Sequence, residues 1–174
     1  LQAVRAGVTA RRASVGADLQ LNESRKFGVS ANVADFSDGN LRHALTASWQ
    51  ERWYSGPRWL VESTLGADAS HNSLGYAAAY FNPPKDHSWW VAGAVENVVW
   101  RNYDRSFRQR LVLTTGSYWQ SGFGSDATEA IEYQHRWELD RDLSLRYGIG
   151  RSLRPYDGVR EARNFGTLTL LWRF

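Results

Sequence analysis

The sequence predicts an all-β chain, a portion of an antiparallel transmembrane β-barrel of the outer-membrane type, and three observations support this class. Apolar and polar residues alternate along most of the chain, which is the period of a strand. The chain has nine Trp, eight Tyr and seven Phe beside fifteen Gly, yet its mean hydropathy is −0.51. No stretch approaches the roughly 20 apolar residues of a spanning helix, so strands must provide any membrane span.

The alternation is visible in residues 15–22, 27–34 and 143–150. It is sharpest over residues 131–139, where Glu and Arg side chains occupy one face and only His135 interrupts the apolar face. Each segment therefore predicts a strand with one apolar and one polar side. A soluble β-sandwich would bury the apolar side, whereas a barrel would expose it to lipid.

Turn residues divide the chain into about eleven strands. The expected short turns are 11–13, 37–40, 69–73, 103–106 and 139–142. The expected longer breaks are 23–25, 54–57, 82–87, 120–127 and 154–163, which lengthen towards the end of the chain. Short turns on one side and longer loops on the other are typical of an outer-membrane barrel.

The last segment, 166–174, alternates strictly and stops on an aromatic residue. Its apolar set is Leu168, Leu170, Trp172 and Phe174. Such an ending is similar to the signal by which outer-membrane barrels are handed to the barrel assembly machinery.

Aromatic residues also gather near the expected strand ends. This set is Trp49, Trp53, Tyr54, Trp89, Trp90, Trp119, Trp137 and Trp172. Amphipathic rings favour the headgroup level of a membrane, so we expect them to form the two aromatic girdles of a barrel.

Several classes of function find no support. The absence of Cys excludes a disulfide framework and thiol catalysis. The net charge of +3 comes with scattered Arg and no basic run that would follow nucleic acid. The His residues lack metal-ligand spacing. Glu132 and Glu138 share a face, but a wet lumen of mixed charge explains them better than paired acid and base catalysis. We therefore predict no enzyme activity, no metal and no cofactor.

A series of segments carries a family resemblance. They read YFNPP (80–84), ENVVWRNYDRSFRQRL (96–111), SYWQSGFGSD (117–126), EYQHRWEL (132–139), YGIGRSLRPYDGVRE (147–161) and LTLLWRF (168–174). In this order they resemble the barrel domain of the poly-β-1,6-N-acetyl-D-glucosamine export porin family, the PgaA type, over residues 74–174.

The resemblance implies an outer-membrane barrel of about sixteen strands. It also implies a preceding periplasmic helical-repeat domain that engages the polymer deacetylase. We therefore expect residues 1–174 to be the C-terminal part of a single barrel domain, truncated on its N-terminal side. The implied function is export of the biofilm exopolysaccharide through the lumen, and the implied partners are partly deacetylated poly-N-acetylglucosamine, outer-membrane lipid, the assembly machinery and the deacetylase.

The polar faces of the strands supply the candidate polymer path. Assigned to the lumen by phase are Asp18, Glu62, Glu96, Trp100, Arg108, Arg110, Tyr118, Glu132, Gln134, Arg136, Glu138 and Arg146. Carboxylates there could pair with polymer ammonium groups, and aromatic rings could stack on sugars. The alternative is that Arg and Glu of neighbouring strands pair with each other and stiffen the wall. Acidic and basic residues nearly cancel in this set, although a path for a cationic polymer should be acidic.

Two further readings stay open at this point. One is another outer-membrane barrel, such as a channel for a different solute, an adhesin or a barrel enzyme. The other is a soluble sugar-binding β-sandwich, which would bury Ile131, Tyr133, Trp137 and Leu139 in a core.

Overall fold

The computed structural model describes residues 7–173, which form one antiparallel sheet of nine strands. The strands are β1 (Ala10–Gln20), β2 (Arg25–Phe36), β3 (Leu41–Ser55), β4 (Trp59–Asn72), β5 (Lys85–Asn102), β6 (Arg105–Gln120), β7 (Gly124–Glu138), β8 (Leu143–Tyr156) and β9 (Val159–Trp172). A short 3-10 helix, η1 (Gly75–Ala77), follows β4. Among the described residues, no helix is long and apolar enough to cross a membrane.

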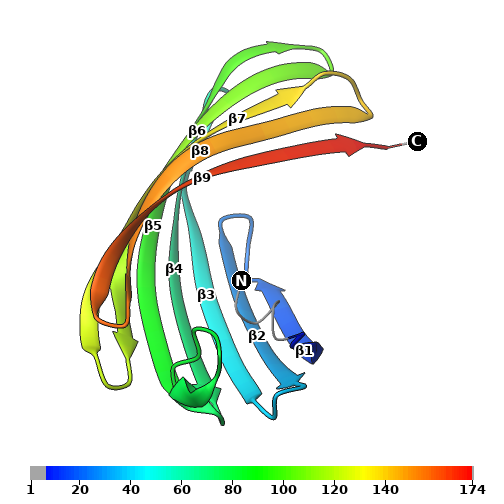
Figure 1. The fold of residues 1–174 in the computed structure, drawn as a ribbon. Coiled ribbons are helices and arrows are strands. Elements are labelled where there is room, and N and C mark those ends of the chain that lie inside the picture. Colours follow the sequence, from blue (N-terminus) through cyan, green and yellow to red (C-terminus); the bar gives the residue numbers. More distant parts are fainter. Residues whose placement is uncertain (1–6, 174) are drawn as a thin grey trace.

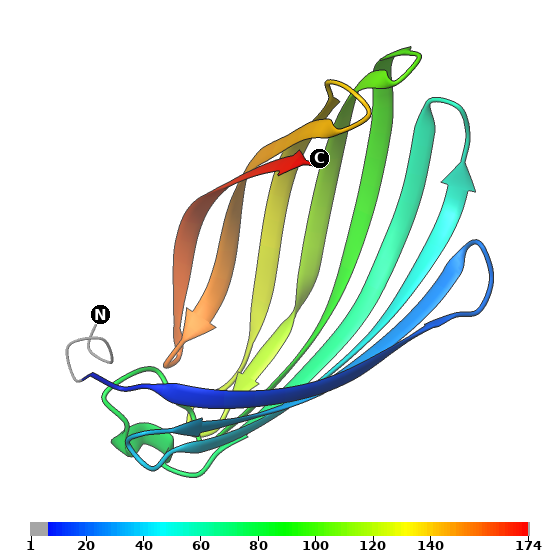
Figure 2. The same cartoon turned by 90° about the vertical axis from the view of Figure 1, so that its right-hand side faces the viewer.

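Each strand pairs with the one before it, so the sheet is an uninterrupted meander from β1 to β9. The sheet curves strongly and forms an open trough (Figure 1). The strands β1 and β9 are its two edges (Figure 2). The trough therefore has a concave face, which would be the lumen side of a barrel, and a convex face.

The strand register decides which residues share a face, because residues paired across an antiparallel ladder point to the same side. One convex row runs across five strands as Val61, Val95, Leu111, Tyr133 and Ile149. Every member of this row is apolar or aromatic. Rows of polar and charged side chains alternate with such rows and line the concave face.

The apolar face has no protein partner in the part of the chain that the structure describes. Among the described residues, the buried hydrophobic side chains Ala34, Ala94 and Tyr118 lie on the concave face. On the apolar convex face, Ile131 is 49% exposed and Leu113 is 53% exposed. A sandwich core that buries Ile131 is therefore contradicted. The predicted all-β, antiparallel membrane-barrel class is confirmed.

The expected number of about eleven strands is too high, because the described chain has nine. One extra strand was expected before a turn at 11–13, but β1 passes through these residues without a break. What was expected further upstream falls on residues 1–6, outside the described residues. The other extra strand was expected between the breaks at 69–73 and 82–87, where the chain instead forms one connection, 73–84, with η1 inside it.

The longest connection is also not where the sequence placed it. The loop expected at 154–163 is a tight turn at Asp157 and Gly158, between β8 and β9. Both residues have positive φ, 50° and 78°, which is the geometry of a two-residue hairpin with an Asp-Gly sequence. The breaks therefore do not lengthen towards the end of the chain, and the long one is 73–84.

Connection 73–84 is held by aromatic contacts that reach from β2 to β8. Tyr80 packs on Phe36 with ring centroids 5.7 Å apart, and Phe81 packs on Tyr156 at 5.2 Å. Burial raises the pKa of Tyr80 above its ordinary value. Because these contacts span most of the sheet, the connection lies across one end of the trough (Figure 1).

Buried Asn side chains fix the base of the same connection. Asn40 donates to Asn82 at 3.0 Å, and Asn82 donates to the Gly75 carbonyl at 3.0 Å. Asn72 donates to the Pro83 carbonyl at 2.7 Å. Side chains therefore satisfy backbone groups that no strand ladder pairs in this stretch.

The aromatic residues near the strand ends are distributed over both faces of the sheet. Phe107 and Trp137 stack on the convex face with centroids 4.1 Å apart near one end, and His87 stacks on Trp119 at 4.7 Å near the other. Trp90 departs from the expected girdles, because its register partners place it on the concave face. In β9, Leu168, Leu170 and Trp172 lie on the convex side, and the expected final aromatic, Phe174, lies outside the described residues.

A charge on the convex face should destabilise the protein far more than a charge on the concave face. We expect Leu113→Arg, in the middle of β6, to lower the free energy of unfolding in lipid by about 2–4 kcal/mol. The matched change Thr114→Arg, one residue further and facing the lumen side, should cost much less. Urea unfolding of the whole protein in vesicles measures both, and equal losses would contradict the assignment of the faces.

Two glycines of neighbouring strands give a second test. A Cβ at Gly116 would lie 2.2 Å from the Trp89 carbonyl oxygen and 2.8 Å from the Trp90 Cα, whereas a Cβ at Gly93 would meet nothing within 4 Å. We expect Gly116→Ala to lower the free energy of unfolding by about 1–3 kcal/mol through overpacking. Gly93→Ala should be neutral or slightly stabilising, since alanine loses less backbone entropy than glycine. Destabilisation by Gly93→Ala alone would refute the packing described here.

Candidate functional site

The concave face is the candidate functional surface, and the register places every predicted lumen residue on it except Trp100. The residues that lie there are Asp18, Glu62, Glu96, Arg108, Arg110, Tyr118, Glu132, Gln134, Arg136, Glu138 and Arg146. Two groups of side chains stand out on this face, one towards each end of the strands.

Trp100 lies on the convex face, in contrast to its assignment by phase. A β-bulge between Val98 and Trp100 shifts the register, so Val98 pairs with Arg108 while Trp100 pairs with Phe107. A bulge adds one residue to one strand, which reverses the facing of everything beyond it. Trp100 therefore belongs with the exposed aromatic residues of the convex side.

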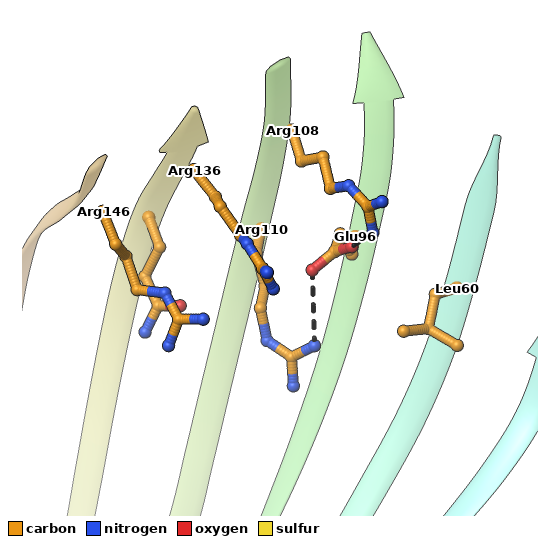
Figure 3. Close-up of a pocket in the computed structure, with 7 residues that line it drawn as sticks. Leu60, Glu96, Arg108, Arg110, Arg136 and Arg146 are labelled. Atoms are coloured by element: carbon orange, nitrogen blue, oxygen red, sulfur yellow. Dashed lines mark hydrogen bonds and ion pairs between the residues drawn. The ribbon is translucent and has the colours of Figure 1, made fainter. Parts of the chain in front are cut away.

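The first group is an arginine cluster built on β5 to β8: Arg108, Arg110, Arg136 and Arg146, with Glu96. They line a cavity of about 380 Å³ together with Leu60 and Gln134. Figure 3 shows the four guanidinium groups converging from neighbouring strands, with Glu96 among them.

Two carboxylates of the concave face are already neutralised beside this cluster. Glu62, whose side chain is 8% exposed, lies 3.4 Å from Arg52 and 3.1 Å from Arg110. Glu96 lies 3.1 Å from Arg108 and 3.9 Å from Arg110. Glu62 of β4, Ala94 of β5 and Val112 of β6 are register partners on the concave face. Because Ala94 is small, it leaves room for Glu62 to reach across β5 to Arg110 of β6.

The arginines of the cluster nevertheless outnumber their partners. Arg108, Arg136 and Arg146 are directly opposite one another on β6, β7 and β8, and like charges in such positions repel. Ion pairs reduce this repulsion: Glu96 pairs with Arg108 at 3.1 Å, and Glu138 pairs with Arg136 at 2.8 Å between carboxylate oxygen and guanidinium nitrogen. Arg146 has no acidic partner within 4.0 Å among residues 7–173, so the cluster carries excess positive charge.

The second group is a groove of about 770 Å³ towards the end covered by connection 73–84. We call it the acidic groove after its two carboxylates, and it is defined by Asp68, Asp86, Trp90, Tyr118 and Arg154; Arg42 also lines it. These residues come from β4, β5, β6 and β8. Of the five, sequence phase had proposed only Tyr118 as a lumen residue.

Neutral groups hold the two carboxylates of the acidic groove. Asp68 accepts hydrogen bonds from Thr46 at 2.9 Å, Ser88 at 3.2 Å and the Trp90 indole at 3.3 Å. Asp86 accepts one from Ser70 at 2.8 Å.

The indole of Trp90 is held against the wall of the groove. The register partners of Trp90 on the two neighbouring strands are both glycines, Gly66 on β4 and Gly116 on β6. A Cβ at Gly66 would fall 2.3 Å from the Trp90 ring, so the ring occupies the space above that glycine. With its N–H bound to Asp68, the indole is fixed along the wall and does not extend across the lumen.

Tyr118 forms the floor of the groove. It is 2% exposed, and its hydroxyl has no hydrogen-bond partner among the described residues. The Arg154 guanidinium lies 4.6 Å from its ring centroid, in a cation-π contact. The groove thus combines two carboxylates, an aromatic surface and an unsatisfied hydroxyl.

A phase argument could have found Asp68 and Asp86, because both have even numbers on strands whose other even residues face inward. The expected turn at 82–87 contains Asp86, and the expected turn at 69–73 puts Asp68 at the last position of its strand, so neither residue reads as part of the wall. Trp90 was missed for a different reason, because its place beside Trp89 suggested a membrane girdle for both.

Buried ion pairs of the sheet should contribute more to the free energy of unfolding than exposed ones. Arg110→Met leaves nearly buried Glu62 with Arg52 alone, so we expect it to lower the free energy of unfolding by about 1–3 kcal/mol. Arg141 pairs with Asp104 at 2.7 Å, but both side chains are largely exposed. Arg141→Met should therefore change the same quantity by less than about 1 kcal/mol. Urea unfolding of the whole protein compares the two, and equal effects would contradict a structural role for the arginine cluster.

Comparison with known proteins agrees with this geometry. The chain is 32% identical over 178 residues to the "Poly-beta-1,6-N-acetyl-D-glucosamine export protein" of Escherichia coli (strain K12) and, equally, to that of Escherichia coli O157:H7. These alignments cover 100% of this chain and 21% of each relative, so the chain spans about a fifth of their length. The solved structure "Bacterial polysaccharide outer membrane secretin" matches with a TM-score of 0.95 and 30% identity, over 99% of this chain and 59% of that one.

The family model described as the PgaA membrane beta barrel domain matches residues 1–174, the whole of the sequence. Sequence, fold and the separation of polar and apolar faces therefore lead to one assignment. The chain belongs to the PgaA membrane β-barrel family of the bacterial outer membrane.

Proposed function

We propose that this chain forms part of the wall of an outer-membrane conduit through which a β-1,6-linked N-acetylglucosamine polymer leaves the cell. The observation that carries the proposal is the largely polar concave face that extends across nine strands, backed by an apolar convex face. Its relatives are named as export proteins for this polymer. The wall guides the polymer and carries out no covalent chemistry.

We further propose that additional strands close the barrel between β9 and β1. In the described residues both edges are unpaired, and an open edge in lipid would leave backbone groups without hydrogen bonds. The matched solved structure extends well beyond the region that this chain covers, which is 59% of it. The chain is then one continuous part of a single barrel domain, inserted by the assembly machinery, and a periplasmic deacetylase acts on the polymer before it enters.

The wall residues have different roles in this proposal. The arginine cluster with Glu62 and Glu96 is mainly structural, because its carboxylates are already paired. Glu132 and Gln134 lie free of such pairs in the described region and offer the polymer weak contacts. Weak contacts suit transport, because a polymer that binds tightly at one point does not leave.

A channel for an anionic solute is the second candidate. The excess positive charge around Arg146 favours it, since rings of Arg are typical of anion pores. It predicts that small anions permeate while polymer export by the same protein is absent.

Adjacent positions on β6 allow a direct test of the conduit. The chain contains no Cys, so single-cysteine variants can be labelled selectively. Thr114 lines the acidic groove. We expect the Thr114→Cys variant to lose most polymer export once a bulky maleimide-polyethylene glycol has reacted with its cysteine. Thr115→Cys faces the convex side and should export normally after the same treatment.

The measurement is surface polymer on cells that depend on this protein for export, with total polymer as the control for synthesis. Continued export by labelled Thr114→Cys cells would contradict a path along this face. Abundant total polymer that never reaches the surface, even before labelling, would instead favour the anion-channel candidate.

A further inference from the structure

We propose that the convex face carries a binding site for a phosphorylated lipid of the outer leaflet, at the end of the sheet from which connection 73–84 extends. We call this site the histidine groove, and it is defined by His43, His71, Lys85, His87 and Trp119. The inference goes beyond the proposed export function, because it concerns the lipid-facing side of the wall and does not depend on what passes through the lumen.

The strand register brings these five residues together on the convex face. It pairs His43 of β3 with His71 of β4, and His71 with Lys85 of β5. One step further from the strand ends, His87 of β5 pairs with Trp119 of β6. No bulge separates these positions from the apolar convex row, so their odd numbers place them on its side of the sheet. They line a groove of about 630 Å³.

The groove has a basic rim. His43, His71 and Lys85 lie side by side on three neighbouring strands, within two residues of the strand ends. All three side chains are exposed. Lys85 has no acidic partner within 4.0 Å among residues 7–173, so its charge is available to an anion beside the sheet.

Two carboxylates of the strands lie near the rim, but neither neutralises it. Asp35 of β2 is on the convex face, diagonal to His43, and it is directly opposite Arg11 of β1. Asp86 borders the groove through its backbone, but its side chain faces the concave side, where Ser70 donates to it at 2.8 Å. The rim therefore keeps its positive character.

Towards the middle of the sheet the groove is narrow and apolar. Ala69 and Ala67 follow each other on the convex side of β4, opposite His87 and Trp89 of β5. His87 stacks on Trp119 with ring centroids 4.7 Å apart, so the two rings form one wall. Small side chains beside large ones leave a channel along the strand. Its shape and its apolar lining fit an acyl chain.

The donor groups of the rim suit a phosphate. An imidazole donates an N–H in its neutral form and adds a positive charge when it is protonated, and an ammonium group donates three. Within residues 7–173, no group of three or more His, Cys, Asp or Glu side chains has the arrangement of a metal site. The rim therefore favours an oxyanion as its ligand.

The level of the rim in the membrane identifies the source of that oxyanion. Outer-membrane barrels carry their longer loops on the extracellular side, and Lys85 directly follows connection 73–84. The rim thus lies at the headgroup level of the outer leaflet, which consists of phosphorylated glycolipid. Basic residues at a membrane surface attract anionic headgroups. A lipid with its phosphate on the rim and one acyl chain along Ala69 uses both parts of the groove.

The test is retention of lipid by the whole protein in detergent, measured by native mass spectrometry. The probes are diphosphoryl lipid A and monophosphoryl lipid A with the same acyl chains. We expect the wild type to retain the diphosphoryl form at concentrations about tenfold lower than the double variant His71→Gln with Lys85→Gln. The difference should be smaller for the monophosphoryl form, because one phosphate fewer meets the rim.

Matched variants separate the two parts of the site. Arg105→Gln removes a cation at the opposite end of the sheet, two residues from Phe107 on the convex face, and it should retain lipid like the wild type. Ala69→Phe fills the channel and leaves every charge in place, so it should weaken retention of both lipids. Heat-modifiable migration on gels reports assembly. If the double variant does not assemble, Lys85→Gln alone should weaken retention about threefold.

Three outcomes would overturn the site. Equal retention of diphosphoryl lipid A by the wild type and the double variant would show that the rim does not bind phosphate. An equal loss in the Arg105→Gln variant would show that any convex cation has the same effect. Weaker retention in the Ala69→Phe variant alone would leave an apolar contact without phosphate recognition. None of these results bears on export, which surface polymer measures separately.

Discussion

The constraint on which this structure depends is that lipid offers no hydrogen bonds to the backbone, so each strand must be paired along its whole length. The uninterrupted antiparallel ladder from β1 to β9 meets this constraint within the sheet. Once the ladder is fixed, the two-residue period of a strand distributes every side chain to lipid or to the lumen. Two bulges, at Arg52/Tyr54 and Val98/Trp100, are the places where this distribution changes phase.

The concave face is divided into regions of different electrostatic character. Towards the end with the turns 103–104 and 139–142, arginine and glutamate side chains pair across strands, and the excess charge is positive. Towards the other end, the acidic groove holds two carboxylates that only neutral groups contact. Arg42 and Arg154 also line this groove, so the two ends differ in pairing: the carboxylates beside the arginine cluster are bound to Arg, and those of the groove are not.

Connection 73–84 links the membrane fold to this surface. Its aromatic residues pack on β2 and β8, while Phe81 and Pro83 line the acidic groove. Outer-membrane barrels carry their longer loops on the extracellular side. In that orientation the arginine cluster lies towards the periplasmic end of the concave face, and the acidic groove lies towards the extracellular end.

The pattern of residues is enough to predict the fold class, because alternation with period two survives any uncertainty about where a strand ends. It also placed most charged residues on the correct face, including Glu62 and Arg110. The faces on which Trp100 and Trp90 lie became known from the folded sheet alone, since a bulge shifts the phase without a clear sequence signal and two adjacent Trp residues look equivalent. The folded sheet also decided which carboxylates are free, because ion pairs form between strands whose register the sequence does not give.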